Sequence, residues 1–259
     1  MRGRLVRCAA VLRFRSGDLG VLLSFLMALG ASARIRLTRG LAYGGEAEAR
    51  LDVYAPVGAD GEAPVVVAMT GVGRVGQALA SRGFVVVVKS GGGLRGGGAP
   101  LIEDLAAVVA WAKANAAAHG GDPQRLFAMG HADGARAAVM LALDPRWLAA
   151  AGLGPATLRG AIGVCGVYAC GDHEPSRYAN AAAPPLLLIA GTSDRTDPAR
   201  HTGRLACALR KVGGQVAEIR YPWVTNRLGL HSFGDALRRR ATALDEVERF
   251  VRLRSLGLG

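Results

Sequence analysis

The sequence predicts a single α/β domain with a mostly parallel central sheet and helices on both faces. Three observations support this fold class: short continuous runs of β-branched residues, helical stretches that alternate with them, and one tight strand–turn–helix junction between glycines. Continuous apolar strands are typical of a sheet that is covered on both faces. Strands that alternate with helices are typical of parallel connections. The chain of 259 residues is long enough for one such domain, which we place at 41–259.

The expected strands differ in their apolar pattern. Ala49–Tyr54 alternates between apolar and polar residues and stops before Pro56, as an edge strand would. Pro64–Ala68 and Phe84–Val88 are continuously apolar, which indicates central strands. The remaining strands are expected at Arg125–Met129, Gly160–Cys165, Pro185–Ala190 and Val216–Tyr221.

Helices are expected between these strands. A closing glycine follows a short helix at Val75–Arg82, and Gly120 ends a longer one at Leu101–His119. Two more are expected at Gly134–Leu143 and Pro198–Lys211. The last helix is amphipathic, and its apolar face consists of Leu237, Ala241, Leu244, Val247 and Val251.

The N-terminus has the features of an export signal. Residues 1–40 contain eight arginines against one aspartate, so they carry +7 of the formal net charge of +12. Five of these arginines precede an apolar run at 19–29. After the run, Ala31-Ser32-Ala33 has the small residues that a signal peptidase requires. We therefore expect residues 1–33 to be a signal peptide or an N-terminal membrane-associated segment. Export to the periplasm or the medium, or membrane association, is the expected location, and a cytoplasmic location is the open alternative.

The rest of the composition excludes several classes of protein. Basic residues are not interleaved with aromatic ones along a stripe, so we expect no nucleic-acid partner. Four scattered cysteines are too few for a disulfide framework or a zinc site, and we expect neither metal nor cofactor. Cys165 and Cys207 are expected to be small buried residues. Whether Cys170 forms a disulfide is left open, as is the oligomeric state.

The strand–turn–helix junction is the segment that carries most information about function. Gly130-His131-Ala132-Asp133-Gly134 has the spacing of the nucleophile elbow G-x-S-x-G, in which a strained turn raises a serine above the sheet. The glycines and the flanking strand and helix are present. The central residue is Ala132, whose methyl group has no atom that can attack a carbonyl.

From this junction outward, the chain resembles the bacterial carboxylesterase family that is related to hormone-sensitive lipase and aryl formamidase. The resemblance covers nearly all of the chain beyond residue 40. It implies an α/β-hydrolase fold. The phrases that carry it are LDVYAP at Leu51, ALASRGFVVVV at Ala78, AWAKANAAAHGGDPQRLFAMGH at Ala110, LALDPRWL at Leu141 and APPLLLIAGTSD at Ala183.

The resemblance implies a Ser–Asp–His triad and an HGG-type oxyanion loop, of which this chain keeps only part. The acid is matched by Asp194, the serine by Ala132 and the histidine by Asn226, with His231 five residues further on. After the third strand, where the family usually has proline, aspartate and tyrosine, this chain has Lys89-Ser90-Gly91. The residues matched to the oxyanion loop and ligand pocket are Thr70, Gly71, Val72, His131 and Asp133.

Two hypotheses about function follow. The first is a catalytically impaired or inactive member of the family that binds a small acyl or ester ligand or a protein partner. The alternative is an active carboxylic ester hydrolase in which Asp133 is the nucleophile and His231 the base. Against the alternative, aspartate is a common capping residue, and Asp133 is placed to cap a helix that begins near Gly134.

Overall fold

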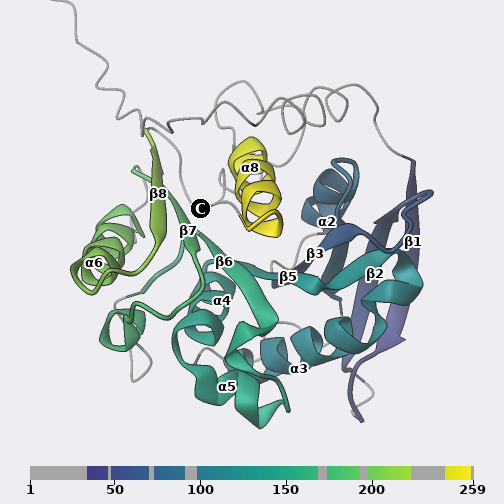
Figure 1. Ribbon diagram of the computed structural model, residues 1–259, viewed down its shortest axis with the longest axis horizontal. Coiled ribbons are helices and arrows are strands. Elements are labelled where there is room, and N and C mark those ends of the chain that lie inside the picture. Colours follow the sequence, from purple (N-terminus) through teal and green to yellow (C-terminus); the bar gives the residue numbers. More distant parts are fainter. Residues whose placement is uncertain are drawn as a thin grey trace, which may run out of the picture. The chain divides into compact units, whose positions relative to one another are not determined.

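The computed structural model describes residues 34–45, 48–69, 73–90, 98–168, 174–192, 198–222 and 243–257. These residues form an eight-stranded sheet in the order β1-β2-β4-β3-β5-β6-β7-β8, with helices on both faces (Figure 1). The expected fold class is therefore confirmed. The strands are β1 (Ile35–Ala42), β2 (Arg50–Pro56), β3 (Ala63–Met69), β4 (Val85–Lys89), β5 (Gly121–His131), β6 (Leu158–Val164), β7 (Leu186–Gly191) and β8 (Val216–Tyr221).

Along the chain, the helices alternate with the parallel strands, as expected, and the last helix follows the last strand. The α-helices are α2 (Gly73–Ala80), α3 (Ala99–Asn115), α4 (Asp133–Leu143), α5 (Pro145–Ala150), α6 (Pro198–Lys211) and α8 (Ala243–Ser255). Three short 3-10 helices are η1 (Ala116–His119), η2 (Pro155–Thr157) and η3 (Pro175–Tyr178). Of the apolar face that the sequence predicts for the C-terminal helix, Leu237 and Ala241 lie outside the described residues.

The first strands of the sheet correct two expectations. β1 begins at Ile35, before the expected domain boundary at 41, and pairs antiparallel with β2. β2 in turn pairs antiparallel with β4, so the segment expected at the edge is an inner strand. From β4 to β8 every neighbouring pair is parallel. The edges of the sheet are β1 and β8, at opposite ends in Figure 1.

Strict alternation along the central strands divides the core between the two faces. On β3, Val65 and Val67 pack against α3, α4 and α5, whereas Val66 and Ala68 face α2 and α8. Both sets are fully buried, which explains why these strands read as continuous apolar runs. A sheet covered on both faces leaves the carboxyl ends of its parallel strands as the place for a site.

A group of charged residues holds α8 against the end of α2. Arg82 donates to Glu248 and, at 2.9 Å, to Asp245. Arg252 donates to the second oxygen of Glu248 at 3.0 Å and to the carbonyl of Arg82 at 2.6 Å. Burial opposes the charge on Arg82, but the two carboxylates raise its pKa above the ordinary value. The last helix is therefore attached by polar as well as apolar contacts.

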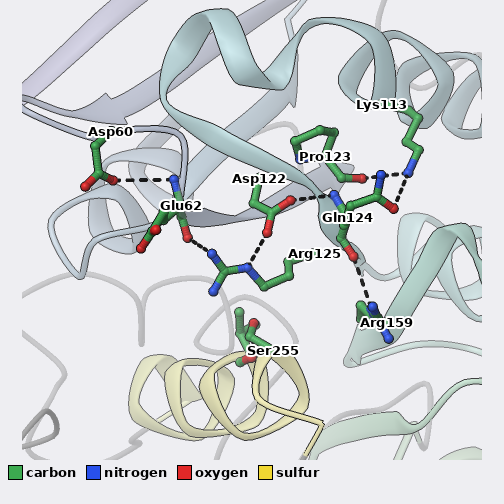
Figure 2. Close-up of polar contacts among 10 residues, drawn as sticks. Asp60, Glu62, Lys113, Asp122, Pro123, Gln124, Arg125, Arg159 and Ser255 are labelled. Carbon is green, nitrogen blue, oxygen red and sulfur yellow. Dashed lines mark hydrogen bonds and ion pairs between the residues drawn. The ribbon is translucent and has the colours of Figure 1, made fainter.

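A second polar group fixes the amino end of β5, on the side of the sheet opposite the elbow. Asp122 accepts from the backbone N–H of Gln124 at 2.7 Å and from Nε of Arg125 at 2.6 Å (Figure 2). Arg125 also donates to the carbonyl of Glu62, and Lys113 donates to the carbonyl of Pro123 at 2.9 Å. These contacts fix the first residues of β5, at 121–125, where the pairing of β5 with β3 shifts in register.

The two described cysteines differ in burial. Cys165 is buried, as expected, but Cys207 is exposed on α6, so that expectation is wrong. Cys8, Cys170 and the predicted signal segment 1–33 lie outside the described residues. Within the described part of the chain, no helix combines the length and the hydropathy needed to cross a membrane.

Candidate active-site elbow

The junction between β5 and α4 is a sharp reversal centred on Ala132. β5 ends at His131 and α4 begins at Asp133, so a single residue separates strand from helix. Ala132 has φ 54° and ψ −118°, a conformation that residues with a side chain rarely adopt. Its N–H donates to the carbonyl of Val164 on β6 at 3.1 Å, and its carbonyl accepts from the N–H of Ala135 at 3.1 Å. These bonds hold the strained turn in place.

The flanking glycines are required by close approach of the backbone. A Cβ on Gly130 would lie 1.9 Å from the carbonyl oxygen of Gly134. A Cβ on Gly134 would lie 2.2 Å from the carbonyl oxygen of Met69, on the neighbouring strand β3. Both distances are far shorter than any real contact, so only glycine fits. The backbone of a nucleophile elbow is thus complete around a side chain that ends in a methyl group.

Asp133 and Arg136 lie beside the apex on the first turn of α4. The carboxylate of Asp133 is 56% exposed and lies 3.6 Å from the guanidinium of Arg136, whose side chain is only 9% exposed. Asp133 is the first residue of α4 and Ala132 is the N-cap, which corrects the expectation that Asp133 caps the helix. His131, at the end of β5, is half-buried.

Cys165 and Tyr168 form the neighbouring wall at the end of β6. Cys165 directly follows Val164, which pairs with His131, and it also has a positive φ of 50°. Its N–H donates to the carbonyl of Ile189 at 2.7 Å. Tyr168 is fully buried, and burial raises the pKa of its hydroxyl, with a smaller contribution from Cys165 in the same direction. The elbow therefore has an apolar, tightly packed surrounding on this side.

The known proteins to which this chain is similar include esterases. In sequence, the chain is 24% identical over 241 residues to an isoprenylcysteine α-carbonyl methylesterase of Arabidopsis thaliana, covering 74% of this chain and 56% of that protein. It is 33% identical over 115 residues to a probable isoprenylcysteine α-carbonyl methylesterase of the same plant, covering 40% of this chain and 27% of the relative. The chain therefore spans about a quarter to about half of the length of these relatives. No family model matches the chain.

Solved structures of esterases have the same arrangement of strands and helices. A truncated carbohydrate esterase from gut microbiota superposes with a TM-score of 0.71 at 14% identity, covering 88% of this chain and 98% of that one. A butyrate-bound esterase from Thermogutta terrifontis gives a TM-score of 0.68 at 19% identity, covering 87% and 95%. The protein has the α/β-hydrolase fold. At this level of identity the structural likeness extends to the fold alone.

Several residues that the resemblance assigns to the site of this α/β-hydrolase-fold protein lie outside the described residues. They are Asp194, Asn226, His231, Thr70, Gly71 and Val72. Of the predicted set, the structure brings together His131, Ala132 and Asp133 at the elbow. Asp194 follows β7 within a few residues, because β7 ends at Gly191.

The described part of the elbow limits what chemistry can occur there. Covalent acyl transfer needs a hydroxyl, thiol or carboxylate at the apex, and Ala132 has none. In the described ranges, no three His, Cys, Asp or Glu side chains are grouped closely enough to hold a metal ion. Asp133 is turned into an ion pair on the helix and does not occupy the apex. What the elbow offers is a rigid turn with a small apolar centre and a buried cation nearby.

The sequence reasoning missed a polar cluster at the carboxyl end of β4. Lys89 is 6% exposed and its ammonium lies 2.7 Å from Asp104 on α3, which also accepts from the hydroxyl of Tyr43. Together with Glu48 and Glu103 these residues line a hollow of about 330 Å³. Position 89 differs from the carboxylesterase family that the chain resembles, and this difference was the signal in the sequence that could have pointed to the cluster. The ion pair shows that Lys89 is accommodated in the fold by Asp104.

Proposed function

We propose that this protein is a catalytically inactive relative of esterases that binds a small acyl or ester ligand at the elbow. The observation that carries the proposal is Ala132 at φ 54° between Gly130 and Gly134. A backbone in such a region costs about 1–3 kcal/mol and persists only where the surroundings impose it. The turn is thus retained although the side chain cannot attack.

The loss of several groups together argues against residual hydrolysis. A hydrolase that lacks a member of its triad keeps only about 10³–10⁴-fold acceleration over water, which the oxyanion hole and binding supply. The resemblance to carboxylesterases implies a serine at position 132, a histidine at 226 and the oxyanion-loop histidine at 70, and this chain has Ala132, Asn226 and Thr70 instead. A ligand could still occupy the space above Ala132, because a methyl group fills less volume than the serine side chain with its hydroxyl.

The first experiment tests for turnover. We expect the purified full chain to hydrolyse p-nitrophenyl acetate no faster than the heat-denatured protein, and to take up no label from a fluorophosphonate probe. Saturable turnover, or a labelled residue in the folded protein, would disprove the inactive state.

The second experiment tests for binding. Butyrate is the probe, because the Thermogutta terrifontis neighbour was solved with butyrate bound. Calorimetric titration should detect saturable binding to the native chain and at least tenfold weaker binding to Ala132→Leu, whose larger side chain fills the apex. Ala150→Leu, on the exposed end of α5, is the control for added bulk and should bind as the native chain does. Equal binding by Ala132→Leu would exclude the elbow as the site.

We also propose that residues 1–33 act as an export signal or membrane segment. The support is the arginine-rich start, the apolar run at 19–29 and Ala31-Ser32-Ala33. Mass spectrometry of the protein recovered from cells and medium should find a chain that begins after Ala33, or an intact chain in the membrane fraction. An intact chain that stays entirely in the cytosolic fraction would refute both versions.

A further inference from the structure

The solvent face of α6 carries a stripe of three cationic residues and one cysteine. Arg200, Arg204, Cys207 and Lys211 follow one another at spacings of four, three and four residues, which places them on one side of a helix. All four are exposed. The buried residues of α6, which lie on its other side, are Thr202, Leu205, Ala206 and Leu209. The stripe therefore faces away from the domain.

Among the described residues, two carboxylates near the stripe are each shared between arginines and do not neutralise them. Glu218 on β8 accepts from Arg210 at 3.3 Å and from Arg220 at 2.6 Å. Glu174 lies 3.5 Å from Arg177 and 3.9 Å from Arg204, whose side chain is 61% exposed. Each carboxylate thus serves two guanidinium groups, and a net positive charge remains on this surface.

The charge is concentrated at this end of the sheet. The segment 198–222 has five Lys or Arg residues and one Glu, whereas the other described residues have sixteen Lys or Arg against thirteen Asp or Glu. α6 and the edge strand β8 lie side by side at one end of the domain (Figure 1). About one-seventh of the described chain therefore carries more than half of its excess charge.

We propose that this face of α6, with Arg210, Val212 and Arg220 beside it, docks on an anionic lipid bilayer. Val212 directly follows Lys211 and is 45% exposed, so an apolar side chain is available next to the cations. A basic surface with an apolar residue at its edge suits a headgroup layer of anionic lipids. A nucleic acid is a poorer fit, because α6 has no Phe, Tyr or Trp on which bases could stack. None of these residues belongs to the elbow at 131–133.

The test is co-sedimentation of the full chain with vesicles. One set is pure phosphatidylcholine, and the other contains about one-third phosphatidylglycerol to supply the anionic surface that attracts basic residues. The native chain should bind the anionic vesicles, and raised salt should weaken the binding. Each Lys or Arg near such a surface contributes about fivefold in affinity, so Arg204→Glu with Lys211→Glu should bind at least tenfold more weakly.

Matched variants separate this surface from general charge and from folding. Arg39→Glu with Arg74→Glu makes the same change of charge on exposed residues of β1 and α2, and should stay within about twofold of the native affinity. Arg204→Gln with Lys211→Gln should give an intermediate loss, and thermal melts should show that all variants fold. Equal loss in both Glu pairs, or equal binding to the two kinds of vesicle, would overturn the proposal. Binding to duplex DNA is measured in parallel. If Arg204→Glu with Lys211→Glu weakened DNA binding and left vesicle binding unchanged, the lipid proposal would be overturned in favour of a nucleic acid.

Discussion

Ala132 adopts a backbone conformation that suits glycine better than alanine. Its φ of 54° lies where a Cβ is crowded by the neighbouring carbonyl, and no side-chain bond compensates. We expect Ala132→Gly to stabilise the fold by about 1 kcal/mol, because relief of the strain exceeds the entropy that glycine loses on folding. Urea unfolding of the two chains measures the difference.

The control for this residue is alanine in an ordinary helix. Ala114 is exposed near the end of α3, and Ala114→Gly should destabilise by up to about 1 kcal/mol, since glycine is the poorer helix former. Opposite signs at the two positions are the expected result. A loss of stability at both would mean that the turn at Ala132 is not strained.

At the scale of elements, one carboxylate of α8 is shared between two guanidinium groups. Glu248 accepts from both Arg82 and Arg252, and its side chain is 11% exposed. Glu248→Gln keeps the size of the side chain but removes the charge that both guanidinium groups need. We expect a loss of about 2 kcal/mol in the free energy of unfolding, typical of hydrogen bonds to charged groups. Guanidinium chloride denaturation measures it.

The matched control is on the same helix. Glu246 pairs with Arg249 one turn along α8, within the helix itself. Such pairs within an exposed helix contribute about 0.3–0.5 kcal/mol, so Glu246→Gln should have a small effect. Similar losses for the two substitutions would show that the contacts between α2 and α8 add nothing.

The contacts of Asp122, at the start of β5, predict that the stability of the fold depends on pH. Burial tends to raise the pKa of Asp122, but the N–H of Gln124 and the guanidinium of Arg125 outweigh it and hold the pKa below the ordinary value. A carboxyl group with a lowered pKa in the folded state stabilises the fold above its unfolded pKa, and loses this effect as the pH falls through the folded value. Asp122→Asn should therefore lower the melting temperature at neutral pH. The difference from the native chain should shrink below about pH 4. A difference that stays constant down to pH 2 would contradict the ionic role of Asp122.

At the scale of the whole molecule, the sequence predicted the layers well because most strands are buried on both faces. The predicted bounds of α6 and β8 agree with the structure, since apolar periodicity and flanking glycines mark their ends. β1 was missed because Ile35–Ala42 pairs irregularly and is mostly half-exposed, which hides the alternation. α5 has only six residues and begins at Pro145, where Asp144 accepts from the N–H of Arg146. A helix this short is marked in the sequence by its capping residue, because it has too few residues to show an apolar period.

The errors at single residues have a common physical origin. Cys207 was expected to be buried because cysteine usually is, but its spacing from Arg204 and Lys211 puts it on the wet face of α6. Asp133 was expected to cap α4, but the positive φ of Ala132 lets the helix begin one residue earlier. In both cases the geometry of the element decides the position, and residue preference does not. The vacant apex at Ala132 was predictable because the spacing of Gly130 and Gly134 sets the register.

The proposed inactive state predicts how hard activity is to introduce, from where the positions matched to the catalytic groups lie along the chain. Ala132 is at the end of β5, whereas in the sequence Asn226 follows β8 and Thr70 follows β3, so the positions that the resemblance matches to the triad and the oxyanion loop come from separate parts of the chain. Ala132→Ser with Asn226→His returns two side chains but leaves the residues at 70–73 unchanged. Each oxyanion donor that is absent costs about 10²–10³ in kcat. We therefore expect kcat/KM for p-nitrophenyl acetate to stay well below the range of about 10⁴–10⁸ M⁻¹s⁻¹ that is typical of enzymes. Recovery into that range would mean that the segment after β3 already supplies donors to the developing negative charge, and that replacing two side chains is enough to give an active esterase.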